Sequence, residues 1–153
     1  MAAQAYLREG IRRIETGEVQ AGSHAAGIFG RCAKEFESAM RVWFTLLLQS
    51  CGLEYEKDIK IHCKGVALNK TTLGNLITGI EQAVVQNPEC VGCAIPSVND
   101  VPSFVGRLRE INVDWVRMKH REEVGIPVIL ERMKSIAGIL EILAVEPQSK
   151  GDA

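Results

Sequence analysis

The sequence predicts an all-α fold, an up-and-down bundle of four to five helices. In each long segment apolar residues recur every three or four positions, which is the period of an amphipathic helix. Glycine and proline separate these segments, and the sequence contains no convincing series of strands and no internal repeat. Of the 153 residues 46% are hydrophobic, enough for one core. We therefore expect a single domain over residues 1–146 and a flexible polar tail at 147–153.

Two helices are expected in the first third of the chain. The first is short, residues 6–15, and Gly17 and Gly22 separate it from a long helix over residues 23–50. Gly52 follows the long helix in the position of a C-terminal cap. The apolar face of this helix consists of Phe29, Cys32, Phe36, Met40, Trp43 and Leu47.

The middle of the chain contains one helix between two segments with weaker patterns. Residues 53–70 mix charges with short apolar alternation, which is compatible with an ordered loop or a small hairpin. Thr71 or Thr72 can cap the next helix, which we expect to stop at Pro88. Residues 87–102 are rich in Pro, Gly, Cys and Asn, so they are interpreted as a loop.

Two further helices complete the expected bundle. The first begins near Pro102 or Ser103, and Gly125 and Pro127 end it. Pro127 suits the first position of the last helix, where a missing N–H costs nothing. The apolar faces are Phe104, Leu108, Ile111, Trp115 and Met118 in the first helix, and Ile129, Met133, Ile136, Leu140 and Leu143 in the second.

Charge and hydropathy limit the partners that we expect. A formal net charge of −1 provides no broad positive field for a nucleic-acid backbone, so we expect no DNA partner and only a local contact if RNA binds. The first fifteen residues resemble no signal peptide, and the most apolar run, residues 42–48, is too short to span a bilayer. The chain is therefore predicted to be cytoplasmic and without a membrane partner.

The five cysteines are interpreted as reduced thiols. A chain without an export signal is expected in a reducing compartment, and an odd number of cysteines prevents a complete disulfide framework. Cys32 and Cys51 fall at apolar helical positions, so we interpret both as packing residues.

Cys90 and Cys93, in the stretch ECVGC, are weak candidates for zinc ligands. Two thiolates at this spacing can hold one side of a zinc ion, and His62 and Cys63 could complete the set. Because only one spaced pair exists, ordinary thiols are the preferred interpretation. GNLITG also lacks the lysine and the serine or threonine of a phosphate-binding loop, and no cofactor is expected.

The order of the elements resembles the HEPN superfamily of helical bundles. The opening YLREGIRRIETGEVQAGSHAAGIFGRCAKEFESAMRVWFTLLLQSCG resembles a HEPN helix, a turn with glycine and a small residue, and a long helix that ends in glycine. TTLGNLITGIEQ resembles the next helix of the family, and FVGRLREINVDWVRMKH resembles the helix that ends in its histidine. The resemblance extends from about residue 6 to residue 144 and implies a HEPN-like bundle.

His120 is the position that matches the histidine of the family. In active HEPN proteins an arginine precedes this histidine with four to six residues between them, and an asparagine frequently follows the arginine. The resemblance implies that two such helices meet across a homodimer and form a metal-independent ribonuclease site. Here the arginine would lie at Val113, Asp114 or Trp115, none of which is arginine.

The residues around His120 support a ribonuclease hypothesis in a changed form. Cleavage of RNA through the ribose 2′-hydroxyl needs a proton acceptor, and a histidine with its near-neutral pKa range is suited to that role. It also needs a cation beside the phosphate, where negative charge accumulates. The candidates are His120, Arg117, Asn112 and Arg109 for catalysis, and Lys119 and Arg121 for RNA binding.

An interaction module is the preferred hypothesis. The arginine of the family is missing, the net charge is close to neutral, and His120 with its neighbouring cations can simply neutralise the last carbonyls of a helix. The sequence therefore favours a non-catalytic HEPN-like module that forms a homodimer or binds a partner protein. The resemblance implies a place in a prokaryotic defence or toxin–antitoxin system.

Overall fold

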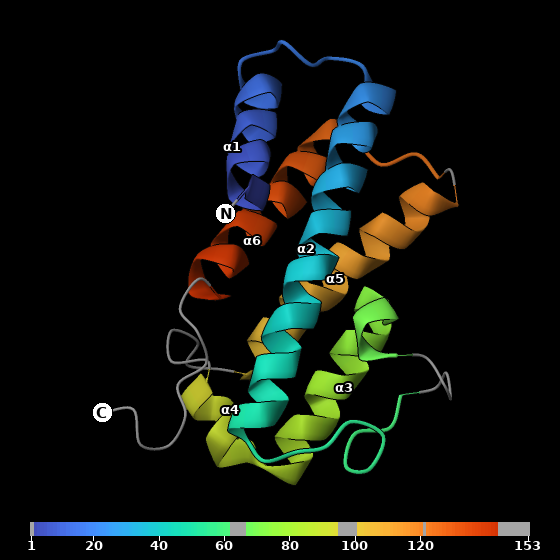
Figure 1. The fold of residues 1–153 in the computed structure, drawn as a ribbon. Coiled ribbons are helices and arrows are strands. Elements are labelled where there is room, and N and C mark those ends of the chain that lie inside the picture. Colours follow the sequence, from blue (N-terminus) through green and yellow to red (C-terminus); the bar gives the residue numbers. More distant parts are fainter. Residues whose placement is uncertain (1, 62–66, 95–100, 121, 144–153) are drawn as a thin grey trace. The chain divides into compact units, whose positions relative to one another are not determined.

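The protein is all-helical over the residues that its structure describes (Figure 1). The structure is a computed structural model that describes residues 2–61, 67–94, 101–120 and 122–143. Six α-helices and no β-strand occur in these ranges, so the prediction of an all-α fold is confirmed. None of the helices in these ranges is both long and apolar enough to cross a membrane.

The chain divides into two compact units, and each unit is made of two stretches of sequence. The first unit contains Met1–Phe36 and Glu110–Glu141, and the second contains Glu37–Arg109 and Ile142–Ala153. All three boundaries between the units fall inside helices. Two of them divide α2 (Gly22–Ser50) and α5 (Val101–Lys119), which contribute to both units, and the third falls near the end of α6 (Ile126–Leu143).

The first unit contains α1 (Ala2–Glu15), the beginning of α2, the end of α5, and most of α6 (Ile126–Leu143). Its core is apolar, because the periodic residues of each helix are buried as their spacing predicts. A methyl group on Gly10 of α1 would lie 2.8 Å from Cγ2 of Ile28 and 2.9 Å from Cε of Met133. Glycine at this position therefore permits close packing of α1 on α2 and α6. The buried residues include Leu7, Ile14, Phe29, Ile111, Trp115, Ile129 and Ile136.

The second unit contains the end of α2, the short 3₁₀ helix Leu68–Lys70, α3 (Leu73–Gln86), α4 (Pro88–Ala94) and the beginning of α5. Its core is largely aromatic and aliphatic. Trp43 of α2 packs edge-on against Phe104 of α5, with ring centroids 6.1 Å apart. Phe44, Leu47, Leu76, Ile80 and Leu108 are also buried.

The beginning of α3 is held by polar groups of α2. Thr72 is the N-cap, and its side chain accepts a hydrogen bond from the backbone N–H of Asn75, as the sequence predicts. One carboxylate oxygen of Glu37 accepts from the backbone N–H of Leu73 at 2.9 Å, and the other accepts from Arg41 at 2.6 Å. Arg41 also donates to the carbonyl of Thr71 at 2.7 Å. These contacts satisfy N–H groups that the first turn of a helix leaves free.

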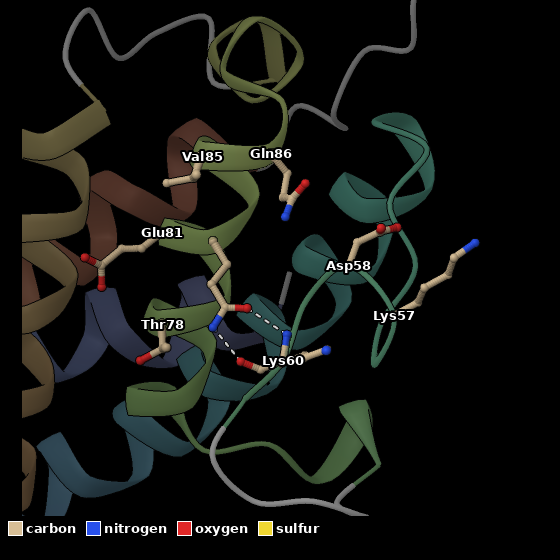
Figure 2. A pocket seen from close by; sticks show the side chains of 8 residues that line it. Lys57, Asp58, Lys60, Thr78, Glu81, Val85 and Gln86 are labelled. Carbon is tan, nitrogen blue, oxygen red and sulfur yellow. Dashed lines mark hydrogen bonds between the residues drawn. The ribbon is translucent and has the colours of Figure 1, made fainter.

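The segment after α2 is an ordered loop over residues 53–61. Its only β-type feature among the described residues is a bridge between Tyr55 and Ile59, so the loop and not the hairpin interpretation holds there. The side chain of Gln82 on α3 accepts from the backbone N–H of Lys60 and donates to its carbonyl (Figure 2). One amide side chain therefore satisfies both backbone groups of Lys60 and fixes the loop beside α3.

The interpretation of residues 87–102 as a loop is wrong for Pro88–Ala94, which form α4. Proline at the first helical position and asparagine before it favour the start of a helix, and both are present. The side-chain oxygen of Asn87 accepts from the backbone N–H of Cys90 at 3.3 Å. Residues 95–100 of this segment lie outside the described residues.

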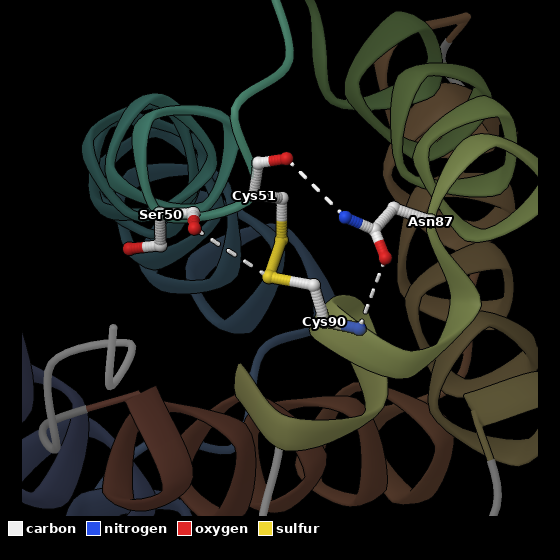
Figure 3. The surroundings of a disulfide bond; sticks show 4 residues. All are labelled: Ser50, Cys51, Asn87 and Cys90. Carbon is white, nitrogen blue, oxygen red and sulfur yellow. Dashed lines mark hydrogen bonds between the residues drawn. A yellow bond between two sulfur atoms is a disulfide. The ribbon is translucent and has the colours of Figure 1, made fainter. Parts of the chain in front are cut away.

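The expectation that all cysteines are reduced is wrong for Cys51 and Cys90, which form a disulfide (Figure 3). Their sequence separation is 39 residues and their Cα atoms are 5.6 Å apart. The bond joins the turn after α2 to α4, and the side chain of Asn87 donates to the carbonyl of Cys51 at 3.3 Å. Cys51 is therefore a covalent partner and not only a packing residue. Cys32 is a free, buried thiol, as its helical position predicts.

Candidate functional site on helix α5

Helix α5 carries most of the residues that the sequence singles out, and it presents a buried and an exposed face. Phe104, Leu108, Ile111 and Trp115 are buried, which confirms these four residues of the predicted apolar face, whereas Met118 is half-buried. Most of the candidate site residues lie on other lines along the helix. Arg109, Arg117, Lys119 and His120 are exposed, and Asn112 is half-buried.

Arg109 is separated from His120. Eleven residues along an α-helix correspond to about 16 Å. Arg109 belongs to the second unit, where its guanidinium forms an ion pair with Glu81 of α3. Arg109 is therefore one turn from Asn112 on the same helix, but it lies too far along α5 to act together with His120.

Asp114 is the centre of an ion network between α5 and α6 in the first unit. Its side chain is 8% exposed, and one of its oxygens accepts from Nε of Arg132 at 2.7 Å. Arg132, which is 18% exposed, also contacts Glu110 at 3.3 Å. The hydrogen bond from Arg132 to Asp114 raises the pKa of this guanidinium further above its usual range, so Arg132 remains charged.

Arg117 belongs to the same network. It contacts the second oxygen of Asp114 at 3.4 Å and donates to Glu122 at 3.1 Å. Two carboxylates therefore offset the charge of Arg117, which precedes His120 by three residues in the sequence. A phosphate that used Arg117 would have to compete with both of them.

Lys119 is also engaged within the helix. Its ammonium group lies 3.7 Å from the centroid of the Trp115 ring, one helical turn earlier, in a cation–π contact. Arg121, the other residue predicted to bind RNA, lies outside the described residues.

His120 follows the last residue of α5. Its backbone N–H donates to the carbonyl of Val116 at 3.0 Å and so closes the last turn, while the residue as a whole is exposed. The backbone N–H of Glu122 then donates to the carbonyl of Arg117. His120 is therefore accessible at the end of a helix.

Two exposed valines on α5 were missed by the sequence reasoning. Val113 is 55% exposed and Val116 is 38% exposed, and they lie one turn apart on the helix. The helical period places Val116 on one line with Asn112 and His120. The α5 outer face, defined here as Asn112, Val113, Val116 and His120, is thus partly apolar. A signal existed in the sequence, because Val113 and Val116 both fall outside the predicted apolar face.

The cysteine pair does not offer two thiolates for zinc. Cys90 is bonded to Cys51, which leaves Cys93 as the only free thiol of the pair. Among the residues with described positions, no group of three or more His, Cys, Asp or Glu side chains could hold a metal ion. His62 and Cys63, the predicted completing ligands, lie outside these residues.

Comparisons of this chain with protein-family models, with curated proteins and with solved structures find no match. The assignment of a function therefore depends on the residues of α5 and on their contacts.

Proposed function

We propose that this protein is a HEPN-like helical interaction module that pairs with a second copy of itself through the α5 outer face. The observation that carries the proposal is the exposure of Val113 and Val116, one turn apart, on a helix whose Phe104, Leu108, Ile111 and Trp115 are buried. Covering exposed apolar side chains is favourable by roughly 25 cal/mol per Å². A single straight helix presents the same face to both copies of a two-fold pair, so it can form a symmetric contact.

The charges near this face favour protein association over RNA binding. Arg117 is offset by Asp114 and Glu122, and Lys119 lies on the ring of Trp115. A nucleic-acid surface instead needs cations that are free to replace counterions along the backbone. A role in a defence or toxin–antitoxin system is part of the proposal, and it is supported by the sequence resemblance alone.

Sedimentation equilibrium at several protein concentrations tests the proposed pairing. We expect the wild type to be dimeric and the double variant Val113→Glu, Val116→Glu to be monomeric, because four carboxylates would face one another in the dimer. Val42→Glu is the matched control, since Val42 is 63% exposed on α2 and lies outside the α5 outer face. Circular dichroism of each variant verifies that the helices remain.

Two results would contradict the proposed pairing. The first is a wild type that stays monomeric at about 100 μM, which corresponds to a standard binding free energy weaker than roughly −5.5 kcal/mol. The second is a dimer that survives in the double variant but is lost with Val42→Glu, which would place the contact on α2.

A metal-independent endoribonuclease is the alternative function, and the exposure of His120 favours it. In this alternative the imidazole accepts the proton of the 2′-hydroxyl, and Arg117 exchanges a carboxylate for the phosphate. The test is the cleavage of a mixed RNA pool in EDTA by the wild type and by His120→Ala, compared at the same oligomeric state.

The outcome of the cleavage assay separates the two functions. Cleavage that disappears in His120→Ala would establish the nuclease, and Glu122→Gln should then increase the rate because it removes one competitor for Arg117. We expect no cleavage by the wild type or by either variant, as for a non-catalytic module.

A further inference from the structure

Three cysteines of the second unit have positions that allow one disulfide to exchange between two pairs. Cys90 on α4 is bonded to Cys51, and Cys93 is an exposed free thiol three residues further along the same helix. Cα atoms three residues apart on an α-helix are separated by about 5 Å. This distance lies within the range that disulfides span. Cys90 therefore has two possible disulfide partners, Cys51 after α2 and Cys93 on α4 itself.

The backbone around this disulfide is held independently of the sulfur atoms. The side chain of Asn87 donates to the carbonyl of Cys51 and accepts from the backbone N–H of Cys90, both at 3.3 Å (Figure 3). These two hydrogen bonds keep Cys51 and Cys90 adjacent when the covalent bond between them opens. For the same reason, the Cys51–Cys90 disulfide can form again after it has been exchanged.

The size of α4 also favours exchange. Helix α4 has seven residues, of which Val91 and Ala94 are buried. A helix with so few buried contacts can adjust its turns at a small cost in free energy.

We propose that Cys51, Cys90 and Cys93 form a thiol–disulfide exchange site. The thiolate of Cys93 attacks Sγ of Cys90, a Cys90–Cys93 bond forms, and the Cys51–Cys90 bond breaks. The electron pair of the broken bond stays on the sulfur of Cys51, which takes up a proton. One disulfide and one thiol are present before and after the step, so no oxidant or reductant is consumed. Exchange replaces a bond between α2 and α4 by a bond within α4.

Peptide mapping distinguishes the two disulfides. The further variants are introduced into a background protein, which is the full chain with Cys63→Ser. Cys32 is retained, because burial raises the pKa of its thiol to about 12 and keeps it unreactive. After thiols are blocked with N-ethylmaleimide in acid, trypsin releases residues 42–57, which contain Cys51, and residues 71–107, which contain both other cysteines. A Cys51–Cys90 bond cross-links these peptides, whereas a Cys90–Cys93 bond lies within the second peptide and leaves Cys51 modified.

We expect both forms in the background protein, and we expect modification of Cys51 to fall about ten-fold or more in Cys93→Ser, which lacks the attacking thiol. Cys90→Ser is the matched control, because it removes the shared sulfur and should leave Cys51 and Cys93 fully modified. Equal modification of Cys51 in the background protein and in Cys93→Ser would overturn the proposal.

A second variant tests whether Cys90 and Cys93 can form a bond, whatever the proportion of the two disulfides in the background protein. Cys51→Ser, treated with oxidised glutathione, should form the Cys90–Cys93 bond and retain no glutathione, since Cys90 displaces it from Cys93. A stable mixed disulfide at Cys93 beside a free Cys90 thiol would show that the two sulfurs cannot meet, and it would also overturn the proposal.

Discussion

At the scale of single residues, the position of Asp114 in the sequence explains an ion pair that joins α5 to α6 in the first unit. It lies three residues after Ile111 and four before Met118, so the helical period places it beside the apolar face of α5. A carboxylate in that position must either leave the core or find a cation there. Arg132 of α6 supplies the cation, and Arg117 adds a second, weaker contact.

Replacement of Asp114 by alanine tests the importance of this ion pair. We expect the free energy of unfolding, measured by urea titration, to fall by about 2–4 kcal/mol because Arg132 would lose its closest partner in a mostly buried place. Glu122→Ala removes an exposed partner of Arg117 and should cost less than about 1 kcal/mol. Similar losses in the two variants would contradict the central role of Asp114.

At the scale of elements, the helices with long apolar stripes are predicted accurately and the short ones are not. Residues 23–50 have about eight turns of periodic sequence, and the observed helix is Gly22–Ser50. Helix α4 has only seven residues, too few for a period of 3.6 to stand out from chance. The Cys51–Cys90 bond was missed for a different reason, because sequence spacing does not indicate which distant cysteines meet.

Replacing a glycine by alanine should change the free energy of unfolding in opposite directions in α2 and in α3. A methyl group on Gly79 would lie 2.9 Å from Cζ and 3.1 Å from Cε2 of the Phe44 ring, so Gly79→Ala should lower the free energy of unfolding by about 1–2 kcal/mol through overpacking. No atom lies within 4 Å of such a methyl group on Gly27. Gly27→Ala should therefore raise the free energy of unfolding by up to about 1 kcal/mol through helix propensity. Urea titration measures both free energies of unfolding. A change of the same sign in the two variants would show that the close contact with Phe44 does not decide the effect of a methyl group on Gly79.

At the scale of the whole molecule, the two units share α2 and α5 as continuous helices. Loss of either helix would remove part of both cores, so we expect the units to unfold in one transition. The sequence supports a helical fold with sufficient apolar material, but it could not indicate this division, because the boundaries in α2 and α5 fall where the apolar period continues without a break. The candidate site was predicted in part. His120 is exposed at the end of α5, whereas the partner of Arg109 depends on a contact with α3 and the Glu122 partner of Arg117 depends on the path of the chain after α5.

The two tryptophans make the prediction of one transition measurable, because Trp43 belongs to the second unit and Trp115 to the first. Trp43→Phe leaves the fluorescence of Trp115, and Trp115→Phe leaves that of Trp43. In each variant the fluorescence midpoint in urea should coincide with the midpoint from circular dichroism. Two separated midpoints within one variant would indicate that the units unfold independently.

The division of the first unit between distant stretches also has a consequence for synthesis. Helix α1 is translated before the other described helices, yet Gly10 packs against Met133 of α6, which is translated more than a hundred residues later. Helix α2 follows directly and can contact α1 early, but the part of the first core that α6 supplies is absent during most of translation. Residues 37–109 of the second unit emerge without such a delay. A nascent chain of this protein would thus expose part of the apolar surface of α1 and α2 to chaperones until α6 is complete.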